Sequence, residues 1–131
     1  MKISTKGRYA LRAMIDIALN GDGNYVSLKV IADRQQISKK YLEQIMTMLV
    51  KANLIETVRG NTGGFKLIKK PSEYTVYEIL SATEGSLAPV DCVTDNTCSR
   101  RKECKMLAFW TGLDDVINEY LKSKTLEDLI K

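Results

Sequence analysis

Apolar residues recur along the first part of the chain at the spacing of short amphipathic helices. Between residues 6 and 20 they follow the i, i+3, i+4 pattern of one helix face. Ser27 is a predicted N-cap for a second helix over residues 28–35, and Ser38 is a predicted N-cap for a third. A short helix, a tight corner and a further helix in this order predict a helix-turn-helix.

A β-hairpin is predicted directly after the third helix. Two β-type runs, 54–58 and 64–68, are separated by a Gly-rich connection that carries Arg59. A helix-turn-helix followed by such a hairpin is the winged-helix arrangement, in which the wing tip lies along the DNA backbone or in a minor groove. Thr75 is a predicted cap for a fourth helix, and the segment after it, 85–104, has almost no core-forming residues.

A long helix with a heptad-like seam is predicted for the last part of the chain. Its apolar residues alternate by four and three, and they are Met106, Trp110, Leu113, Ile117 and Tyr120, reinforced by Leu107, Val116 and Leu121. This surface is more than a small winged domain can cover, so a second copy of the chain is the expected partner. A last turn of helix is predicted after it, capped by Thr125.

The predicted fold is mainly α with a small β wing. We expect a winged helix-turn-helix DNA-binding domain over residues 1–84 and a cysteine-rich cluster-binding loop over 85–104. We expect a dimerisation helix with a C-terminal turn over 105–131.

Composition and charge exclude few classes of protein. The chain has 131 residues, with 20 Lys and Arg against 16 Asp and Glu, and its net charge of +4 permits a polyanionic partner without requiring one. No stretch approaches the roughly 18 apolar residues of a membrane span, and the start of the chain is charged, so we expect a cytoplasmic protein with no membrane association. The chain has no histidine, no Ser or Cys paired with a general base and no Walker-type loop, which predicts that it is not an enzyme.

Polar side chains form a ridge along the third predicted helix. Lysines there can neutralise phosphates, Gln44 can pair with adenine, and Glu43 can accept from cytosine N4. Arg59 at a glycine-flanked tip can enter a narrow minor groove. The alternative interpretation of both features is ordinary solvated surface. The predicted DNA-binding residues are Ser38, Lys39, Lys40, Tyr41, Glu43, Gln44, Thr47, Arg59, Gly60 and Asn61.

Cys92, Cys98 and Cys104 are the only cysteines of the chain, at C-x5-C-x5-C spacing. Clustered cysteines in a reducing compartment are more often metal ligands or redox sensors than disulfides, and an odd number cannot pair off completely. Three crowded thiolates repel one another unless a cation or an iron cluster accepts them. Zinc would require a fourth ligand that no histidine supplies, so iron-sulfur is favoured over zinc. The alternative is three incidental thiols.

Several blocks of the sequence resemble one known family in order and spacing. MKISTKGRYALRAM, YLEQIM, VRGNTGGFKL and the C-x5-C-x5-C spacing together resemble the IscR, NsrR and CymR group of winged-helix regulators, the Rrf-two family, over essentially the whole chain. The resemblance implies a homodimer that binds inverted-repeat operators in double-stranded DNA. It also implies that Cys92, Cys98 and Cys104 hold an iron-sulfur cluster, as in the members that sense one. The predicted function is therefore a transcription regulator, a repressor, that senses cluster status.

The chain departs from this family pattern at two positions. IscR-like members supply a histidine three residues after the last cysteine, where this chain has Leu107, and NsrR-like members use a carboxylate at the position of Arg8. The fourth ligand stays open between Asp91, Asp95, Glu103, a group from the partner chain, an exogenous thiol and solvent. A two-iron cluster is preferred over a four-iron one.

A regulator without a metal cluster is the alternative. The beginning of the chain and its closing TLEDL also resemble CymR-like members, which lack this cysteine set and act through an enzyme partner. The cysteines would then form a thiol redox switch, or an enzyme partner would control the regulator.

Overall fold

The order of helices and strands along the chain is that of a winged helix-turn-helix followed by a long helix. The computed structural model describes residues 2–60, 63–95 and 98–131. Its elements, in chain order, are α1 (Thr5–Asn20), α2 (Leu28–Gln35), α3 (Lys39–Lys51), β1 (Ile55–Val58), β2 (Gly64–Leu67), the 3-10 turn η1 (Pro71–Glu73), α4 (Val76–Glu84), the 3-10 turn η2 (Asp91–Val93), α5 (Leu107–Ser123) and α6 (Leu126–Ile130). The prediction of a mainly α fold with a small β wing is confirmed.

Four helices begin at hydroxyl side chains that were predicted as caps. The side-chain oxygens of Ser27, Ser38, Thr75 and Thr125 each accept a hydrogen bond from the amide three residues further on, at 3.1 to 3.2 Å. An N-cap satisfies one of the amides that a helix leaves free at its first turn. These contacts explain why α2, α3, α4 and α6 begin where the sequence predicted.

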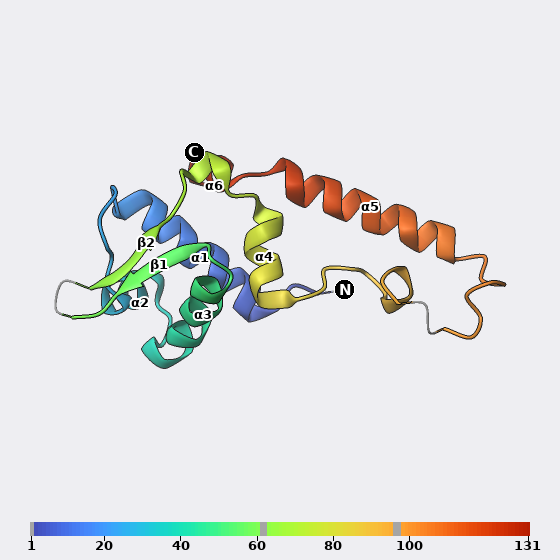
Figure 1. Cartoon of the computed structure of the whole chain (residues 1–131), viewed down its shortest axis with the longest axis horizontal. Helices are drawn as coiled ribbons and strands as arrows, with labels where there is room; N and C mark the ends of the chain where they lie inside the picture. Colours follow the sequence, from blue (N-terminus) through green and yellow to red (C-terminus); the bar gives the residue numbers. More distant parts are fainter. Residues whose placement is uncertain (1, 61–62, 96–97) are drawn as a thin grey trace.

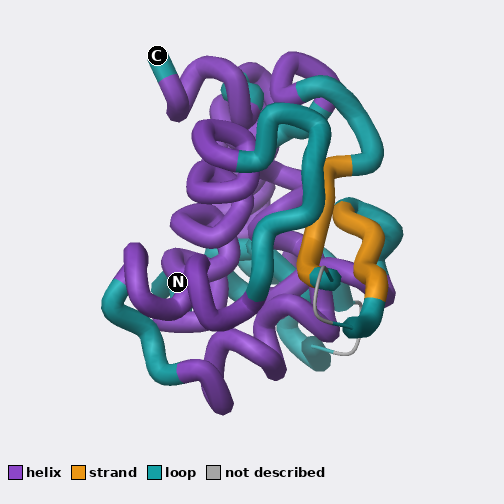
Figure 2. The backbone as a smooth tube through the Cα atoms, turned by 90° about the vertical axis from the view of Figure 1, so that its left-hand side faces the viewer, coloured by secondary structure: helices purple, strands orange, loops and turns teal. Residues whose placement is uncertain are grey.

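The helices pack together beside the two strands (Figure 2). The core lies where α1 contacts α2, α3, α4 and α6. Met14 of α1, Ile31 of α2, Ile45 of α3 and Ile79 of α4 are fully buried in one cluster. Leu126 of α6 joins the same cluster with no exposed surface. The end of the chain therefore packs on the helix near its beginning.

The wing is an antiparallel pair of short strands supported by a third segment. β1 pairs with β2 from Ile55 opposite Leu67 to Val58 opposite Gly64, so each strand is one residue shorter than predicted. The backbone of Val26 exchanges hydrogen bonds of 2.8 and 2.9 Å with Phe65. Gly64 has a φ of +152°, and a Cβ there would lie 2.3 Å from the carbonyl oxygen of Val26. Glycine at this position therefore permits the close approach of the two segments.

α5 extends from the body as an arm, and the described residues 85–95 and 98–106 lie between the end of α4 and the far end of this helix (Figure 1). Apolar residues cover two neighbouring faces of this helix. The half-buried face contains Leu107, Trp110, Ile117 and Leu121. The exposed face contains Met106, Phe109, Leu113, Val116 and Tyr120, which are 36 to 63% exposed.

The predicted heptad seam is therefore only partly right. It assigned Trp110 and Ile117 to the same face as Met106, Leu113 and Tyr120, but these two side chains are half-buried on the neighbouring face. The reason is that α5 packs on α4 and η2, which uses part of its apolar surface within the chain. The heptad spacing persists on the exposed face with Phe109 and Val116 in place of the other two.

None of the helices in the described part of the chain is both long enough and apolar enough to span a bilayer.

Candidate nucleic-acid interface and cysteine segment

The predicted polar ridge of α3 is exposed along its length. Lys40, Glu43, Gln44 and Thr47 line one shallow hollow on the helix surface, and Lys39 lies beside them at the exposed start of the helix. The opposite face of α3 is fully buried in the core. Among the residues that the structure describes, none of these charged groups is in an ion pair. The lysines and the carboxylate are consequently available to a partner molecule.

Three of the residues predicted to contact DNA from α3 and its cap already have local roles. The hydroxyl oxygen of Ser38 caps the helix, and the hydroxyl of Thr47 donates to the carbonyl of Glu43 at 2.8 Å. The ring of Tyr41 is half-buried and lies edge-on to the ring of Tyr9 at 5.8 Å. Ser38 and Thr47 keep free hydrogen-bonding capacity, since a hydroxyl can both donate and accept. Tyr41 lies at the edge of the ridge.

A buried ion pair holds the helix-turn-helix together, and the sequence reasoning missed it. The carboxylate of Asp16 in α1 is 1% exposed and accepts from both nitrogens of one side of the Arg34 guanidinium, at 2.7 and 3.0 Å. It also accepts from the side-chain amide of Gln35 at 2.9 Å. The hydrogen bonds that Arg34 donates to Asp16, and the negative charge of that carboxylate, raise the pKa of Arg34. The hydrogen bonds of Asp16 join the two helices. Because they link α1 to α2 at the corner before α3, they position the ridge.

Arg12 extends this network toward α3. Its guanidinium donates to the side-chain oxygen and to the backbone carbonyl of Gln35, and it lies 5.0 Å from the centre of the Tyr9 ring. The signal available in the sequence was a lone carboxylate, Asp16, within the apolar stripe of the first helix. A buried carboxylate requires a paired cation, but its spacing could not identify Arg34 as the partner.

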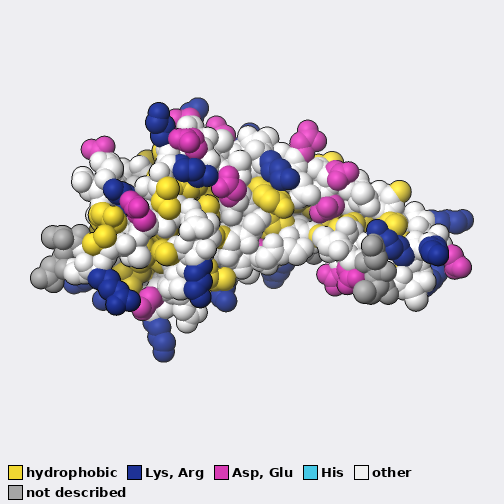
Figure 3. Space-filling model, in the orientation of Figure 1, with side chains coloured by type: hydrophobic (Ala, Val, Ile, Leu, Met, Phe, Trp, Pro, Cys, Tyr) yellow, Lys and Arg dark blue, Asp and Glu magenta, His cyan; other side chains and the backbone are white. Residues whose placement is uncertain are grey.

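The wing tip presents a cation to solvent. Arg59 and Gly60 are exposed, and Gly60 has a φ of +110° with open space around it. The amide of Gly63 donates to the carbonyl of Gly60 at 3.0 Å, which closes the turn. Asn61, which was also predicted to contact DNA, lies outside the described residues. Lys and Arg side chains project from the lower edge of the body in Figure 3, below the position that α3 occupies in Figure 1.

The cysteine segment lies far from α3, beside the start of α5 (Figure 1). All three thiols are free; Cys92 is half-buried in η2, whereas Cys98 and Cys104 are exposed. Arg101 donates to the backbone carbonyl of Cys92 and, at 3.3 Å, to that of Asp95. In the described residues, the structure does not gather three or more Cys, Asp or Glu side chains at metal-binding separation.

The donor set nevertheless fits an iron-sulfur cluster in its chemistry. Thiolates are the ligands that such clusters take, and Arg100, Arg101, Lys102 and Lys105 place positive charge around the three cysteines. Leu107, at the position where the resemblance implies a histidine, lines one hollow with Cys98, Arg101 and Lys102. Binding a cluster would require the segment to bring the thiols together.

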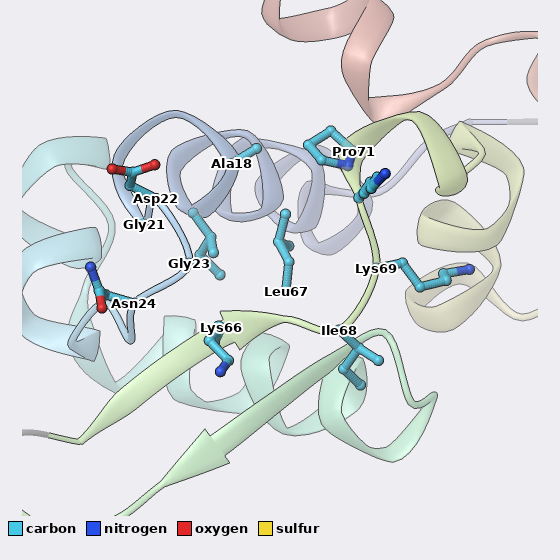
Figure 4. A pocket seen from close by; sticks show the side chains of 12 residues that line it. Ala18, Gly21, Asp22, Gly23, Asn24, Lys66, Leu67, Ile68, Lys69 and Pro71 are labelled. Atoms are coloured by element: carbon cyan, nitrogen blue, oxygen red, sulfur yellow. The ribbon is translucent and has the colours of Figure 1, made fainter.

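A third hollow, of about 400 Å³, lies between the end of α1 and the end of β2 (Figure 4). The side chain of Leu67 points into it, while the side chains of Lys66 and Lys69 point away from it. Lys66 instead pairs with Glu56 at 3.3 Å, and Lys69 pairs with Glu78 of α4 at 3.1 Å. Few polar groups therefore converge on this hollow, which does not have the character of a ligand site.

The fold and the exposed ridge define a class of protein, the winged helix-turn-helix regulators. The family model described as an iron-dependent transcriptional regulator, Rrf2, matches residues 3–131. The chain is 38% identical over 130 residues to the HTH-type transcriptional regulator IscR of Escherichia coli, which covers 99% of this chain and 80% of that protein.

Solved structures agree with this match. The structure of CymR, the global cysteine regulator of B. subtilis, has a TM-score of 0.78 and 36% identity, with 99% of this chain and 96% of that one covered. The structure of T. potens IscR has a TM-score of 0.76 and 38% identity, with 99% of this chain and 86% of that one covered. The chain belongs to the Rrf2 family of transcriptional regulators, which are DNA-binding proteins and not enzymes.

Proposed function

We propose that the protein is a homodimeric repressor that binds an inverted-repeat operator with α3 in the major groove and the wing at the backbone or minor groove. The exposed ridge of α3 carries this proposal, because its lysines, glutamine and carboxylate are free on a helix whose other face is buried. Lys39 and Lys40 neutralise phosphates, whereas Glu43 and Gln44 read base edges. Two copies related by a two-fold axis read half-sites about one helical turn apart.

The exposed face of α5 is the proposed dimer interface. Its five apolar residues follow the heptad spacing of a helix pair, and they are exposed in the single chain. Burying this face against a second copy would remove the largest exposed apolar stripe on α5 from water. The proposed domain division stays that of the sequence, in which residues 1–84 bind DNA, 85–104 sense and 105–131 dimerise, with the difference that α6 packs in the core of the DNA-binding body.

Operator selection tests the DNA-binding proposal. The full chain is used to select duplexes from a random-sequence pool, and the selected duplex is then titrated with variants. Gln44→Ala should weaken binding to the selected duplex by about 1–3 kcal/mol and relax the sequence preference at one position of each half-site. Lys40→Ala should weaken binding to all sequences alike and reduce the salt dependence. Equal losses on selected and random duplexes for both variants would contradict the proposal.

For sensing, we infer that Cys92, Cys98 and Cys104 hold an iron-sulfur cluster that alters operator affinity. The donor set, the cations around it and the IscR-like relatives support this inference. Because the thiols are apart in the structure, binding would order the segment that contains them, and metal binding coupled to folding can supply several kcal/mol for a change in the attached helix. The candidates for the fourth ligand remain those named from the sequence, and a two-iron cluster is preferred.

Protein purified without air tests this inference directly. Iron and acid-labile sulfide are measured together with visible absorption, in the native chain and in variants with each cysteine changed to serine. Ser99→Ala, within the same segment, is the control. Loss of iron in each cysteine variant, with retention in the control, supports the inference, whereas iron-free native protein contradicts it.

A thiol redox switch is the second candidate. The observation in its favour is that two of the three thiols are exposed and free, and the B. subtilis structure of similar fold is that of a global cysteine regulator. In this case oxidant changes operator affinity in iron-free protein, and the change is reversed by a reductant. An enzyme partner that copurifies in a fixed ratio would instead indicate control through protein binding.

A further inference from the structure

Tyr74 joins three parts of the chain at a point that neither the ridge nor the cysteines include. It lies between η1 and α4 and has no exposed surface. Its hydroxyl donates to the carbonyl of Leu54 at 2.6 Å and accepts from the amides of Ile68 and Lys69 at 2.9 and 3.1 Å. One donor and two lone pairs are all that a phenol offers, so its hydrogen-bonding capacity is fully used.

These three backbone groups form the base of the wing. Leu54 directly precedes β1, and Ile68 and Lys69 directly follow β2. A single hydroxyl therefore closes the end of the hairpin opposite the tip. An isolated two-stranded hairpin is only marginally stable in water, so its orientation depends on such external contacts.

The other side of Tyr74 is bound to the segment that follows α5. Its carbonyl accepts from the amide of Leu126 at 2.9 Å, and the amide of Val76 donates to the carbonyl of Lys124 at 2.8 Å. The side chain of Lys69 lies over the Tyr74 ring, with its ammonium 4.8 Å from the ring centre. Tyr74 therefore links the C-terminal segment, through its backbone, to the wing, through its hydroxyl.

We propose that Tyr74 is a positioning residue for DNA binding, which fixes the angle of the wing and so determines where Arg59 meets the duplex. The proposal rests on the proposed function of the wing. Arg59 lies five residues beyond Leu54, which is about 17 Å at the rise of a β-strand. A tilt of about 10° at the base would displace the tip by roughly 3 Å, which is as long as the hydrogen bond that Arg59 would make.

A double-mutant cycle tests this proposal. Tyr74→Phe removes the hydroxyl and keeps the ring, and Arg59→Ala removes the group that it positions. Binding is measured on a duplex selected by the unmodified full chain from a random-sequence pool. Tyr74→Phe should weaken binding about tenfold, and in the Arg59→Ala background it should weaken binding less than about twofold, because nothing is left at the tip to misplace.

A matched control separates positioning from simple loss of stability. Ile79→Val removes one methyl group from a fully buried side chain of α4 and leaves the hydrogen bonds at the wing base in place. It should lower the melting temperature, but well below that temperature it should leave the affinity for the duplex unchanged. Hydrogen exchange at the amides of Ile68 and Lys69 should rise in Tyr74→Phe and not in this control.

Each outcome supports or overturns the proposal. Equal losses from Tyr74→Phe with and without Arg59, or no loss at all, overturn it. No effect of Arg59→Ala alone overturns the proposed function of the wing, and the positioning role with it. If Tyr74→Phe fails to fold, Lys69→Met loosens the same base from its exposed side, and an additive effect of Lys69→Met and Arg59→Ala likewise overturns the proposal.

Discussion

Changing Val116 to aspartate is the sharpest test of the dimer interface. Val116 lies in the middle of the exposed face of α5 and is 63% exposed in the single chain. In a two-fold dimer built on this face, each substitution occurs twice, close to the symmetry axis. The change therefore removes apolar burial from both copies and introduces two like charges into the interface.

The magnitude follows from the exposed fraction of Val116. Burying a whole valine side chain contributes about 1.5 kcal/mol, so the 63% that remains exposed contributes about 1 kcal/mol per copy and about 2 kcal/mol per dimer. This loss alone raises the dimer Kd about 30-fold. Two carboxylates that lose water near one another add to it, because a buried charge without a partner costs several kcal/mol.

The assay is sedimentation velocity over a range of protein concentrations, with circular dichroism to verify the fold. Thr111→Asp is the matched control, because Thr111 is also β-branched and exposed on α5. It lies five residues before Val116, about 140° around the helix. Val116→Asp should sediment as a monomer at concentrations where the control is a dimer, and its binding to an inverted repeat should weaken to that of a single half-site.

A dimer of unchanged Kd in Val116→Asp would refute the reasoning. The exposed face of α5 would then not be the interface, and the apolar stripe would require another explanation. A monomeric control would also count against it, because the helix itself would then be the cause.

Three further outcomes test the body of the protein. Arg34→Ala removes the cation and leaves the carboxylate of Asp16 buried without it. Urea denaturation should show that the free energy of unfolding falls by about 2 kcal/mol, which is less than for a fully buried pair because the arginine is partly exposed. A decrease within experimental error would contradict the role of the pair. Gly64→Ala should lower the free energy of unfolding by about 2 kcal/mol, because φ is +152° and a Cβ would collide with backbone; unchanged stability would refute this strain. Hydrogen bonds from the backbone and hydroxyl of Thr125 lower the pKa of Asp128. The ionised carboxylate should therefore stabilise α6 above the ordinary pKa of 3.8, and this stabilisation should be lost as the pH falls through the lowered pKa. An NMR titration that gives a pKa of 3.8 or higher would contradict this.

Local signals predicted the helices well because local contacts create them. Ser27, Ser38, Thr75 and Thr125 act on amides three residues away, so the sequence alone contains both partners of each cap. The wing was predicted to within one residue at each strand for the same reason, since Gly-rich turns and β-branched runs are local.

Contacts between distant parts of the chain were not predictable in this way. Asp16 and Arg34 are 18 residues apart, and Tyr74 reaches Leu54 across 20. Nothing in their spacing identifies them as partners. The face of α5 was misassigned in part because periodicity shows that apolar residues share a side of a helix but not which element covers that side. The even spacing of the cysteines likewise predicted a ligand set, whereas their arrangement in space depends on how a segment with little regular structure folds.

The arm that carries the cysteines is attached to the body at both ends, and this limits how it can move. At one end the carboxylate of Glu84 accepts from the amide and the hydroxyl of Ser4 at 3.0 and 2.5 Å, at the start of α1 and one residue before the segment begins at Gly85. At the other end, the backbone of Lys124 and Leu126 is hydrogen-bonded around Tyr74. A segment fixed at two points can still rearrange internally, but a contraction that shortens the distance between its ends pulls on both attachments. We therefore expect a contraction of this kind, if cluster binding causes it, to act on α4 and on the segment around Tyr74, both of which pack on the DNA-binding body.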